Sequence, residues 1–225
     1  MALCLIATGE DLVSEGGASV SEAVAAHAHG VYESPLTPES WGKLGMWIFL
    51  AGDAMSFGTL LVAYGAVRFG SGDWPVPAHI LGTALSGFMT FLLICSSVTM
   101  VWALAAAQEG NLAGFRKNII LTILGGVIFL SLQYYEWSHF MLGQNLWFTN
   151  NPFGAPLFGT TFYIITGFHG MHVTAGVIYL LTILIKGWNG LYLGEGQSNY
   201  VEILGLYWHF VDLVWIMVFT FIYLL

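Results

Sequence analysis

The chain has 225 residues, of which 57% are hydrophobic and only 8% are charged, and its formal net charge is −8. Because soluble globular domains carry about 25% charged residues, this composition excludes an ordinary soluble domain and favours a membrane protein. A basic nucleic-acid-binding surface is also excluded, since 5 Lys and Arg residues stand against 13 Asp and Glu residues.

Residues 1–40 form an acidic N-terminal segment. They include Glu10, Asp11 and Glu15 among other acidic residues, and they contain no Lys or Arg. A segment with this charge imbalance usually stays solvated and unfolded. We therefore predict a flexible cytoplasmic tail over residues 1–40 and a separate membrane domain over residues 41–225. A docking arm is the alternative role for the tail.

Five long apolar segments make up the rest of the chain. They run over residues 41–68, 78–107, 115–142, 157–186 and 200–225, and stretches rich in Gly, Pro and Asn separate most of them. A helix needs about 20 residues to cross about 30 Å of hydrocarbon, and every segment exceeds that length. The predicted fold class is therefore all-α, an integral membrane bundle of five transmembrane helices. No internal repeat is visible, which disfavours an inverted-repeat transporter.

The few basic residues orient the predicted helices. With the N-terminus in the cytoplasm, Lys43, Arg116, Lys117 and Lys186 lie on the inner side and Arg68 lies on the outer side. This distribution satisfies the positive-inside rule. We therefore expect a cytoplasmic N-terminus and a periplasmic C-terminus.

The two cysteines indicate neither a metal site nor a disulfide. Cys4 and Cys95 are far apart and match no spacing of metal ligands. Because Cys95 lies inside an apolar segment, we expect it to be a small buried hydrophobic residue.

Polar and ionisable side chains inside the first and third segments are candidate functional residues, because an unpaired one is costly in hydrocarbon. Asp53 lies in the first segment. In the third segment, Gln133, Glu136 and His139 follow one another at intervals of three residues. One face of a helix can therefore hold all three side chains.

The fourth and fifth segments carry the remaining candidates. In the fourth, His169 and His172 share a helix face within Gly-Phe-His-Gly-Met-His-Val, whose glycines allow another backbone to come close. In the fifth, Glu202 lies near the inner end, and His209 and Asp212 share a face in mid-helix.

Several of these groups fall at about the same depth in the membrane. They are Asp53, His172, His209 and Asp212. We predict a polar layer in which these side chains satisfy one another within the bundle, so that interhelix hydrogen bonding is their main role.

Three other roles are weighed against this interpretation. A tight zinc site takes four ligands, and thiolates are absent from this group. Haem ligation needs axial histidines, which His169, His172 or His209 would supply. Proton relay would use Asp53, Glu136 or Asp212. We predict no catalytic, cofactor-binding or metal site in this chain.

At four places the sequence resembles subunit III of the respiratory haem–copper oxidases. Residues 47–57 (Trp-Ile-Phe-Leu-Ala-Gly-Asp-Ala-Met-Ser-Phe) resemble the family segment that holds an intramembrane carboxylate, and residues 133–137 resemble its Gln-x-x-Glu-aromatic pattern. Residues 167–173 match its Gly-x-His-Gly-x-His-Val motif, and residues 207–215 match its aromatic-Trp-His-Phe-x-Asp-x-x-Trp motif. The last two motifs are highly specific, and the resemblance covers residues 41–225.

The resemblance implies a non-catalytic subunit of a cytochrome c oxidase in the inner (plasma) membrane of a bacterium. Such a subunit packs against the catalytic subunit I, stabilises it and supports proton uptake while the complex reduces oxygen to water and pumps protons. The implied partners are subunits I and II, a further subunit IV, and membrane lipids that include bound phospholipid. The haems and copper are expected in partner subunits, so this chain would belong to an oxidoreductase complex without holding a redox centre.

Two features depart from the larger family pattern. Many members have seven helices and a Glu at the position of Asp53, whereas this chain has five predicted helices and an Asp. The five-helix form with Asp is also similar to subunit III of quinol oxidases, so the electron donor, cytochrome c or quinol, stays open. Further alternatives are an accessory protein of nitric oxide reductase, a small transporter or proton channel, and a haem-binding membrane anchor.

Overall fold

The computed structural model describes residues 41–77, 81–148, 152–194 and 197–225, and the predicted acidic tail lies outside these ranges. The described residues form helices α2 (Trp41–Gly70), α4 (Thr83–Gln108), α5 (Leu112–Ser138), α6 (Leu157–Gly187) and α7 (Asn199–Val218). Two π-helical segments, η1 (His139–Gly143) and η2 (Phe219–Leu224), extend α5 and α7. Five of the resulting helical stretches are long and apolar enough to cross a membrane, which confirms the predicted all-α class and helix number.

The helix ends differ from the prediction where local chemistry intervenes. The second membrane helix begins at Thr83 rather than near residue 78, because Gly82 takes a non-helical ψ of 79° at its N-cap. The third begins at Leu112, since the Asn111 side chain accepts a hydrogen bond from the Gly114 backbone at 2.9 Å and caps the helix. These ends are set by single backbone conformations, which hydropathy does not report.

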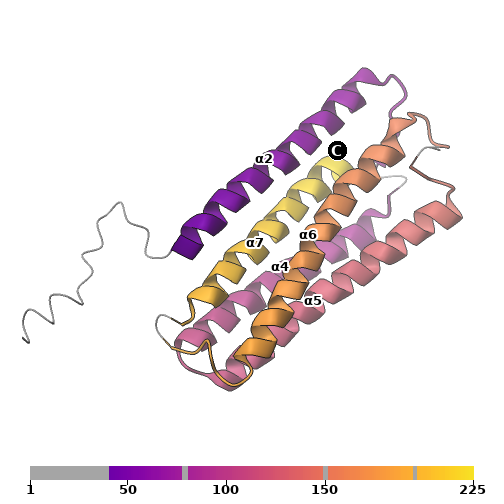
Figure 1. Cartoon of the computed structure of the whole chain (residues 1–225). Helices are drawn as coiled ribbons and strands as arrows, with labels where there is room; N and C mark the ends of the chain where they lie inside the picture. Colours follow the sequence, from indigo (N-terminus) through magenta and orange to yellow (C-terminus); the bar gives the residue numbers. More distant parts are fainter. Residues whose placement is uncertain (1–40, 78–80, 149–151, 195–196) are drawn as a thin grey trace, which may run out of the picture. The chain divides into compact units, whose positions relative to one another are not determined.

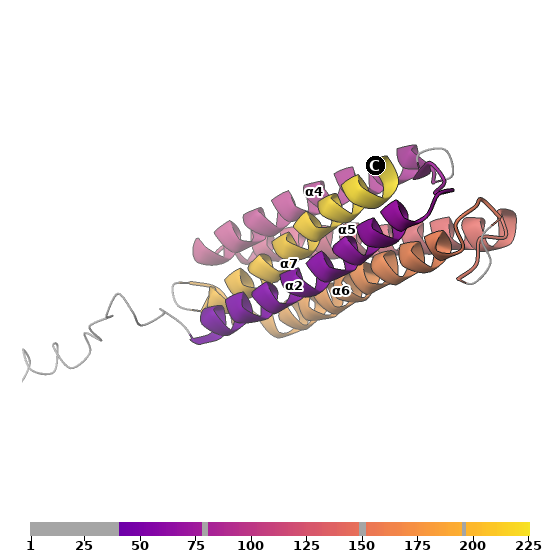
Figure 2. The same ribbon diagram turned by 90° about the horizontal axis from the view of Figure 1, so that it is seen from above.

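Helices α4 to α7 form a closed ring of neighbours. α4 packs against α5 and α7, and α6 packs against the same two helices. Figures 1 and 2 show these four helices running side by side, with the short connection at residues 109–111 turning α4 back into α5. A connection this short makes α4 and α5 antiparallel neighbours.

The centre of the ring is filled by Trp208 of α7. Its side chain is 1% exposed and its Nε1 donates to Ser96 Oγ of α4 at 3.1 Å. A Cβ added at Gly126 of α5 would lie 2.7 Å from the indole ring, and one at Gly176 of α6 would lie 2.9 Å from it. Two glycines therefore make the space that one large aromatic side chain occupies.

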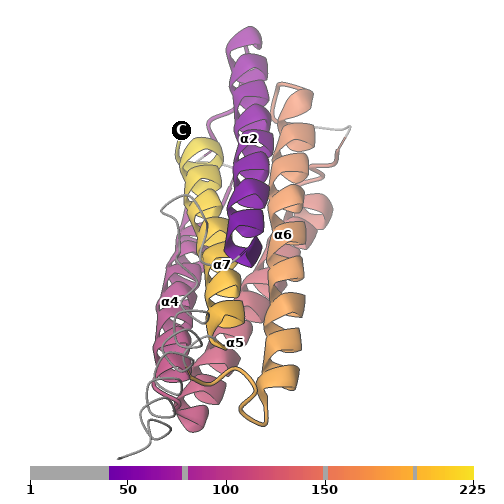
Figure 3. The ribbon, with the colours of Figure 1, turned by 60° about the vertical axis from the view of Figure 1, so that its left-hand side comes forward.

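Helix α2 is packed far less than the others. In its most apolar stretch 11% of the residues are buried inside the protein, against 56% in the last membrane helix. The buried residues of α2 are Leu50, Phe57 and Tyr64, which recur every seven positions and form one narrow stripe. Figure 3 shows α2 lying in front of α6 and α7. Most of the surface of α2 is thus left open.

The prediction for Cys95 was wrong. The residue lies within α4, as expected, but its side chain is exposed on the outside of the bundle. An apolar environment in a membrane helix is either protein or lipid, so hydropathy alone does not identify buried positions.

Candidate functional site

A polar pair joins α2 to α6 near the middle of both helices. His172 Nε2 lies 3.3 Å from Asp53 Oδ2, and both side chains are largely buried. His172 Nδ1 lies 2.7 Å from the carbonyl oxygen of Phe168, and because that oxygen only accepts, Nδ1 carries a hydrogen. The Asp53 carboxyl and the His172 imidazole thus face each other across the α2–α6 contact at ion-pair distance. Each group provides the other with a polar neighbour, which lowers its cost in hydrocarbon.

The attraction within this pair is electrostatic rather than a well-aligned hydrogen bond. Asp53 Oδ2 has no hydrogen-bond partner among the described residues, although it is at ion-pair distance from the imidazole. The rings of Phe57 and Phe168 lie 5.1 Å and 4.6 Å from the His172 ring. These aromatic neighbours keep the local dielectric low, so the attraction is weakly screened.

Glu136 is the centre of a second polar cluster, which joins three helical elements. Its side chain is 2% exposed. Ser86 of α4 donates to Oε1 at 2.8 Å, and Tyr223 of η2 donates to Oε2 at 2.8 Å. A cavity of about 130 Å³ adjoins the carboxyl, and its lining includes His139 and Gln144. Because each carboxyl oxygen has a donor, Glu136 is suited to hold α4, α5 and η2 together.

Removal of one of these donors should lower stability measurably. Tyr223→Phe deletes the hydroxyl and keeps the ring, so we expect the free energy of unfolding to fall by about 1–3 kcal/mol, the cost of leaving a buried acceptor without its donor. The measurement is the unfolding midpoint of the purified chain in detergent. Tyr134→Phe is the control, since that side chain is 77% exposed. Equal midpoints for the two variants would contradict the role given to Glu136.

Polar groups of α7 reach α4. Trp215 Nε1 donates to Thr90 Oγ1 at 3.0 Å. Trp208, two turns earlier in α7, likewise donates to a hydroxyl group of α4. Asp212 accepts from Ser97 Oγ through Oδ2 at 2.8 Å, whereas its Oδ1 has no partner within the described ranges. Asp212 therefore contributes to the α4–α7 contact.

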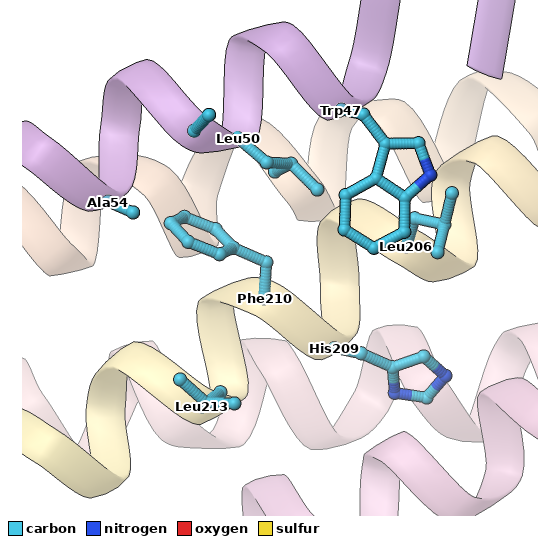
Figure 4. Close-up of a pocket in the computed structure, with 8 residues that line it drawn as sticks. Trp47, Leu50, Ala54, Leu206, His209, Phe210 and Leu213 are labelled. Atoms are coloured by element: carbon cyan, nitrogen blue, oxygen red, sulfur yellow. The ribbon is translucent and has the colours of Figure 1, made fainter. Parts of the chain in front are cut away.

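His209 lies apart from Asp212, in a groove between α2 and α7. The groove has a volume of about 390 Å³, and its lining is apolar except for the imidazole. Figure 4 shows Trp47 and Leu50 on the α2 side, and Phe210 and Leu213 with His209 on the α7 side. The groove therefore offers an apolar surface along two helices.

The four side chains that were predicted to form one mid-membrane layer make separate contacts in the structure. The structure brings Asp53 and His172 together at 3.3 Å. It places Asp212 against Ser97 and His209 in the α2–α7 groove. The polar side chains thus act between different pairs of helices rather than as one connected layer.

His169 is enclosed by aromatic rings. Its ring lies 4.8 Å from Trp215, 5.6 Å from Phe129 and 6.4 Å from Phe57, and the residue is 0% exposed. Neither ring nitrogen has a hydrogen-bond partner in the part of the chain that the structure describes. His169 and His172 both lie against the Phe57 ring, and His172 in addition faces the Asp53 carboxyl.

Gln133 of α5 packs into the glycine face of α6. Its Nε2 donates to the Thr166 carbonyl oxygen at 2.7 Å. A Cβ added at Gly170 would lie 2.9 Å from Gln133 Oε1, and one at Gly167 would lie 3.0 Å from the Trp137 ring. The sequence analysis expected these glycines to let another backbone come close. In the structure they make room for side chains of α5 instead.

The remaining predicted residues lie near helix ends. Glu202 Oε2 is 2.8 Å from Lys43 Nζ, which joins the start of α7 to the start of α2. His139 is exposed at the start of η1, where it stacks on Tyr135. Gln133 and Glu136 are buried, whereas His139 is exposed and lines the cavity beside the Glu136 carboxyl.

The hydroxyl partners of Glu136 and Asp212 were not predicted from the sequence. Ser86 and Tyr223 bond Glu136, and Ser97 bonds Asp212. A signal was present, because positions 86, 90 and 97 of α4 all carry hydroxyl side chains and fall on one narrow face of a helix with 3.6 residues per turn.

The metal-ligating side chains are dispersed. Within the described ranges, no three His, Cys, Asp or Glu side chains are close enough together to hold a metal ion. Of the three histidines considered for haem, His169 is packed among rings, His172 faces a carboxyl and His209 lines a groove.

Comparison with known proteins yields consistent matches. A family model described as cytochrome c oxidase subunit III matches residues 39–225. The chain is 33% identical to cytochrome c oxidase subunit 3 of Alkalihalophilus pseudofirmus over 183 residues, which cover 81% of this chain and 85% of the relative. It is 35% identical to the protein of that name from Synechocystis over 199 residues, or 88% of this chain and 80% of the relative. It is 32% identical to that of Bacillus subtilis, with 81% and 85% covered.

Proposed function

Since the chain belongs to the cytochrome c oxidase subunit III family, and is thus a component of a multi-subunit oxidase, we propose that it packs against the catalytic subunit I without taking part in the redox chemistry. In this role it stabilises the catalytic subunit and supports proton uptake while oxygen is reduced to water. Subunit II and a further subunit IV complete the proposed set of protein partners.

The exposure of α2 is the observation that carries the packing proposal. Away from its buried stripe, the exposed surface of α2 carries large side chains such as Ile48 and Met55, and between them small residues, namely Gly45, Gly52, Ser56, Thr59, Ala63 and Ala66. The Ser56 and Thr59 hydroxyls donate to carbonyl oxygens one turn earlier in α2, so they need no polar partner. Small residues of this kind let two membrane helices approach closely. A helix of the catalytic subunit would fit this face.

A large side chain on that face should weaken assembly. No atom of the described residues lies within 4 Å of a Cβ added at Gly52. Gly52→Leu should therefore leave the fold intact but obstruct a partner helix. We expect about tenfold less catalytic subunit to co-purify with the tagged chain, since overpacking costs about 1–3 kcal/mol. Cys95→Leu enlarges an exposed side chain of α4 and is the control. Full recovery of the catalytic subunit with Gly52→Leu would exclude this face as the interface.

Purification through a tag on the wild-type chain tests the proposal as a whole. We expect a haem–copper catalytic subunit in the eluate and oxidation of cytochrome c, as the names of the relatives indicate. The chain alone is expected to show no haem Soret band, because His169 is packed among aromatic rings, His172 faces a carboxyl and His209 lines an apolar groove. A quinol-oxidising complex, a nitric oxide reductase or a stoichiometric Soret band from the chain alone would overturn it.

The Asp53–His172 pair supports the proposed link to proton uptake. It places a carboxyl and an imidazole near the middle of the membrane helices, with Oδ2 3.3 Å from Nε2. A group of this kind at mid-membrane either stabilises the bundle or influences nearby proton transfer. We assign it first to the attachment of α2, through which it would act on the catalytic subunit.

The membrane placement is part of the same proposal. We place the chain in the inner membrane of a bacterium, with its N-terminus in the cytoplasm and its C-terminus in the periplasm. The basic residues are distributed unequally between the two ends of the bundle. One end holds the starts of α2 and α5 and the end of α6, with Lys43, Arg116, Lys117 and Lys186, whereas the other holds Arg68 at the end of α2. This distribution supports the orientation. The apolar α2–α7 groove supports a bound phospholipid, whose acyl chain it would accommodate (Figure 4).

A further inference from the structure

We propose that the start of α5 and the end of α6 form a site for the headgroup of an anionic phospholipid. The proposal rests on the membrane placement given above and specifies a second lipid site, away from the α2–α7 groove. Three of the five basic residues of the chain gather here: Arg116 and Lys117 of α5, and Lys186 of α6.

The packing of the two helix ends brings these cations together. A Cβ added at Gly187 would lie 3.1 Å from the Phe115 ring, so the last turn of α6 rests on the first turns of α5. Arg116 Nε donates to the Trp188 carbonyl oxygen at 3.0 Å, and its guanidinium lies 4.5 Å from the centre of the Trp188 ring. Figure 1 shows these ends of α5 and α6 close together. Arg116 thus joins the two helix ends on which the exposed Lys117 and Lys186 lie.

Among the residues that the structure describes, no carboxyl group is paired with the cations at this place. Lys43, at the same end of the bundle, is paired with Glu202 at 2.8 Å. The ion pairs found among the described residues do not include Arg116, Lys117 or Lys186. Each Lys or Arg near a membrane surface favours an anionic lipid by about fivefold, so three cations at one place favour one strongly.

Exposed apolar side chains beside the cations specify a lipid rather than free phosphate. Ile185, Trp188 and Leu191 are exposed next to Lys186. A ligand that covers both the cations and these side chains needs a phosphate group and an apolar part. A phospholipid has both, and Arg and Trp at a helix end are suited to the boundary between headgroups and acyl chains.

Photo-crosslinking tests the site in the full chain with whatever subunits co-purify. The preparation is placed in phosphatidylcholine nanodiscs with a trace of photoreactive phosphatidylglycerol or, separately, of photoreactive phosphatidylcholine with the same chains. Cross-links are mapped by peptide mass spectrometry. We expect phosphatidylglycerol to dominate at residues 115–124 and 181–191, and high salt to reduce this preference.

The variants make the outcome decisive. Lys117→Gln with Lys186→Gln should lower the phosphatidylglycerol preference by about 25-fold, whereas Lys43→Gln, which removes a paired cation, should leave it nearly unchanged. Equal labelling by both lipids in the wild type, an unchanged preference in the double variant, or full competition by inorganic phosphate would each overturn the proposal. Failure of the proposed function would show instead as a missing catalytic subunit in the same preparations, with the lipid preference intact.

Discussion

Trp208→Ala is expected to lower the free energy of unfolding by about 3 kcal/mol or more, as for other truncations of large buried aromatic residues. The indole contacts the glycine faces of α5 and α6 and donates to Ser96 of α4, so its removal leaves a cavity where four helices meet. Ser96 Oγ would also lose its buried donor. Lipid is as apolar as the core, so the loss arises from packing and hydrogen bonding rather than from the hydrophobic effect.

The unfolding midpoint in detergent measures this effect, and Trp102→Ala is the matched control. Trp102 belongs to α4 but is 58% exposed, so its truncation leaves no cavity inside the protein. Gly176→Leu should be as damaging as Trp208→Ala, because its side chain would enter the space of the indole. A Trp208→Ala midpoint close to that of Trp102→Ala would show that the ring of helices does not depend on this residue.

Helix number and class were predictable because both follow from length and composition. Segments of this length and hydropathy must satisfy their backbone hydrogen bonds internally in lipid, and helices do so. The start of α4 was not predictable in the same way. It depends on the backbone conformation of Gly82, and residues on both sides of this glycine are compatible with a helix.

Several of the residues singled out from the sequence are buried, among them Glu136 and Asp212, but their partners were not identified. Glu136 and Tyr223 are 87 positions apart in sequence and bond at 2.8 Å. Such a contact depends on which helices are neighbours and on their rotation about their axes. A single sequence gives the depth of each polar group in the membrane, whereas the neighbour is set by packing, as the separation of His209 from Asp212 shows.

Exposure to lipid is the second property that the sequence did not reveal. Cys95 and the outer face of α2 lie in apolar helices, yet they are open to the surroundings of this chain. In a soluble protein, an apolar stripe marks the core because the other face must contact water. In a membrane helix both faces are apolar, and the more informative signal is side-chain size, since small residues mark places of close helix contact.

The α2–α6 pair should respond asymmetrically to the loss of either partner. His172→Leu leaves Asp53 Oδ2 with no charge partner in an aromatic environment, and we expect a loss of about 3 kcal/mol, the low end for breaking a buried pair. Asp53→Leu should cost about 1 kcal/mol, because the imidazole keeps its Nδ1 hydrogen bond to the Phe168 carbonyl oxygen. The double Leu variant should recover most of the loss caused by His172→Leu, since no unpaired carboxyl remains.

A double-mutant cycle with two readouts checks this order. The first is the unfolding midpoint of the chain, and the second is the amount of catalytic subunit that co-purifies. Because the pair attaches the weakly packed α2, the co-purification loss should follow the same order as the stability loss. Equal effects of the two single variants would contradict the larger cost assigned to the unpaired Asp53 carboxyl. A double variant as unstable as His172→Leu would show that packing, not the unpaired carboxyl, accounts for the loss.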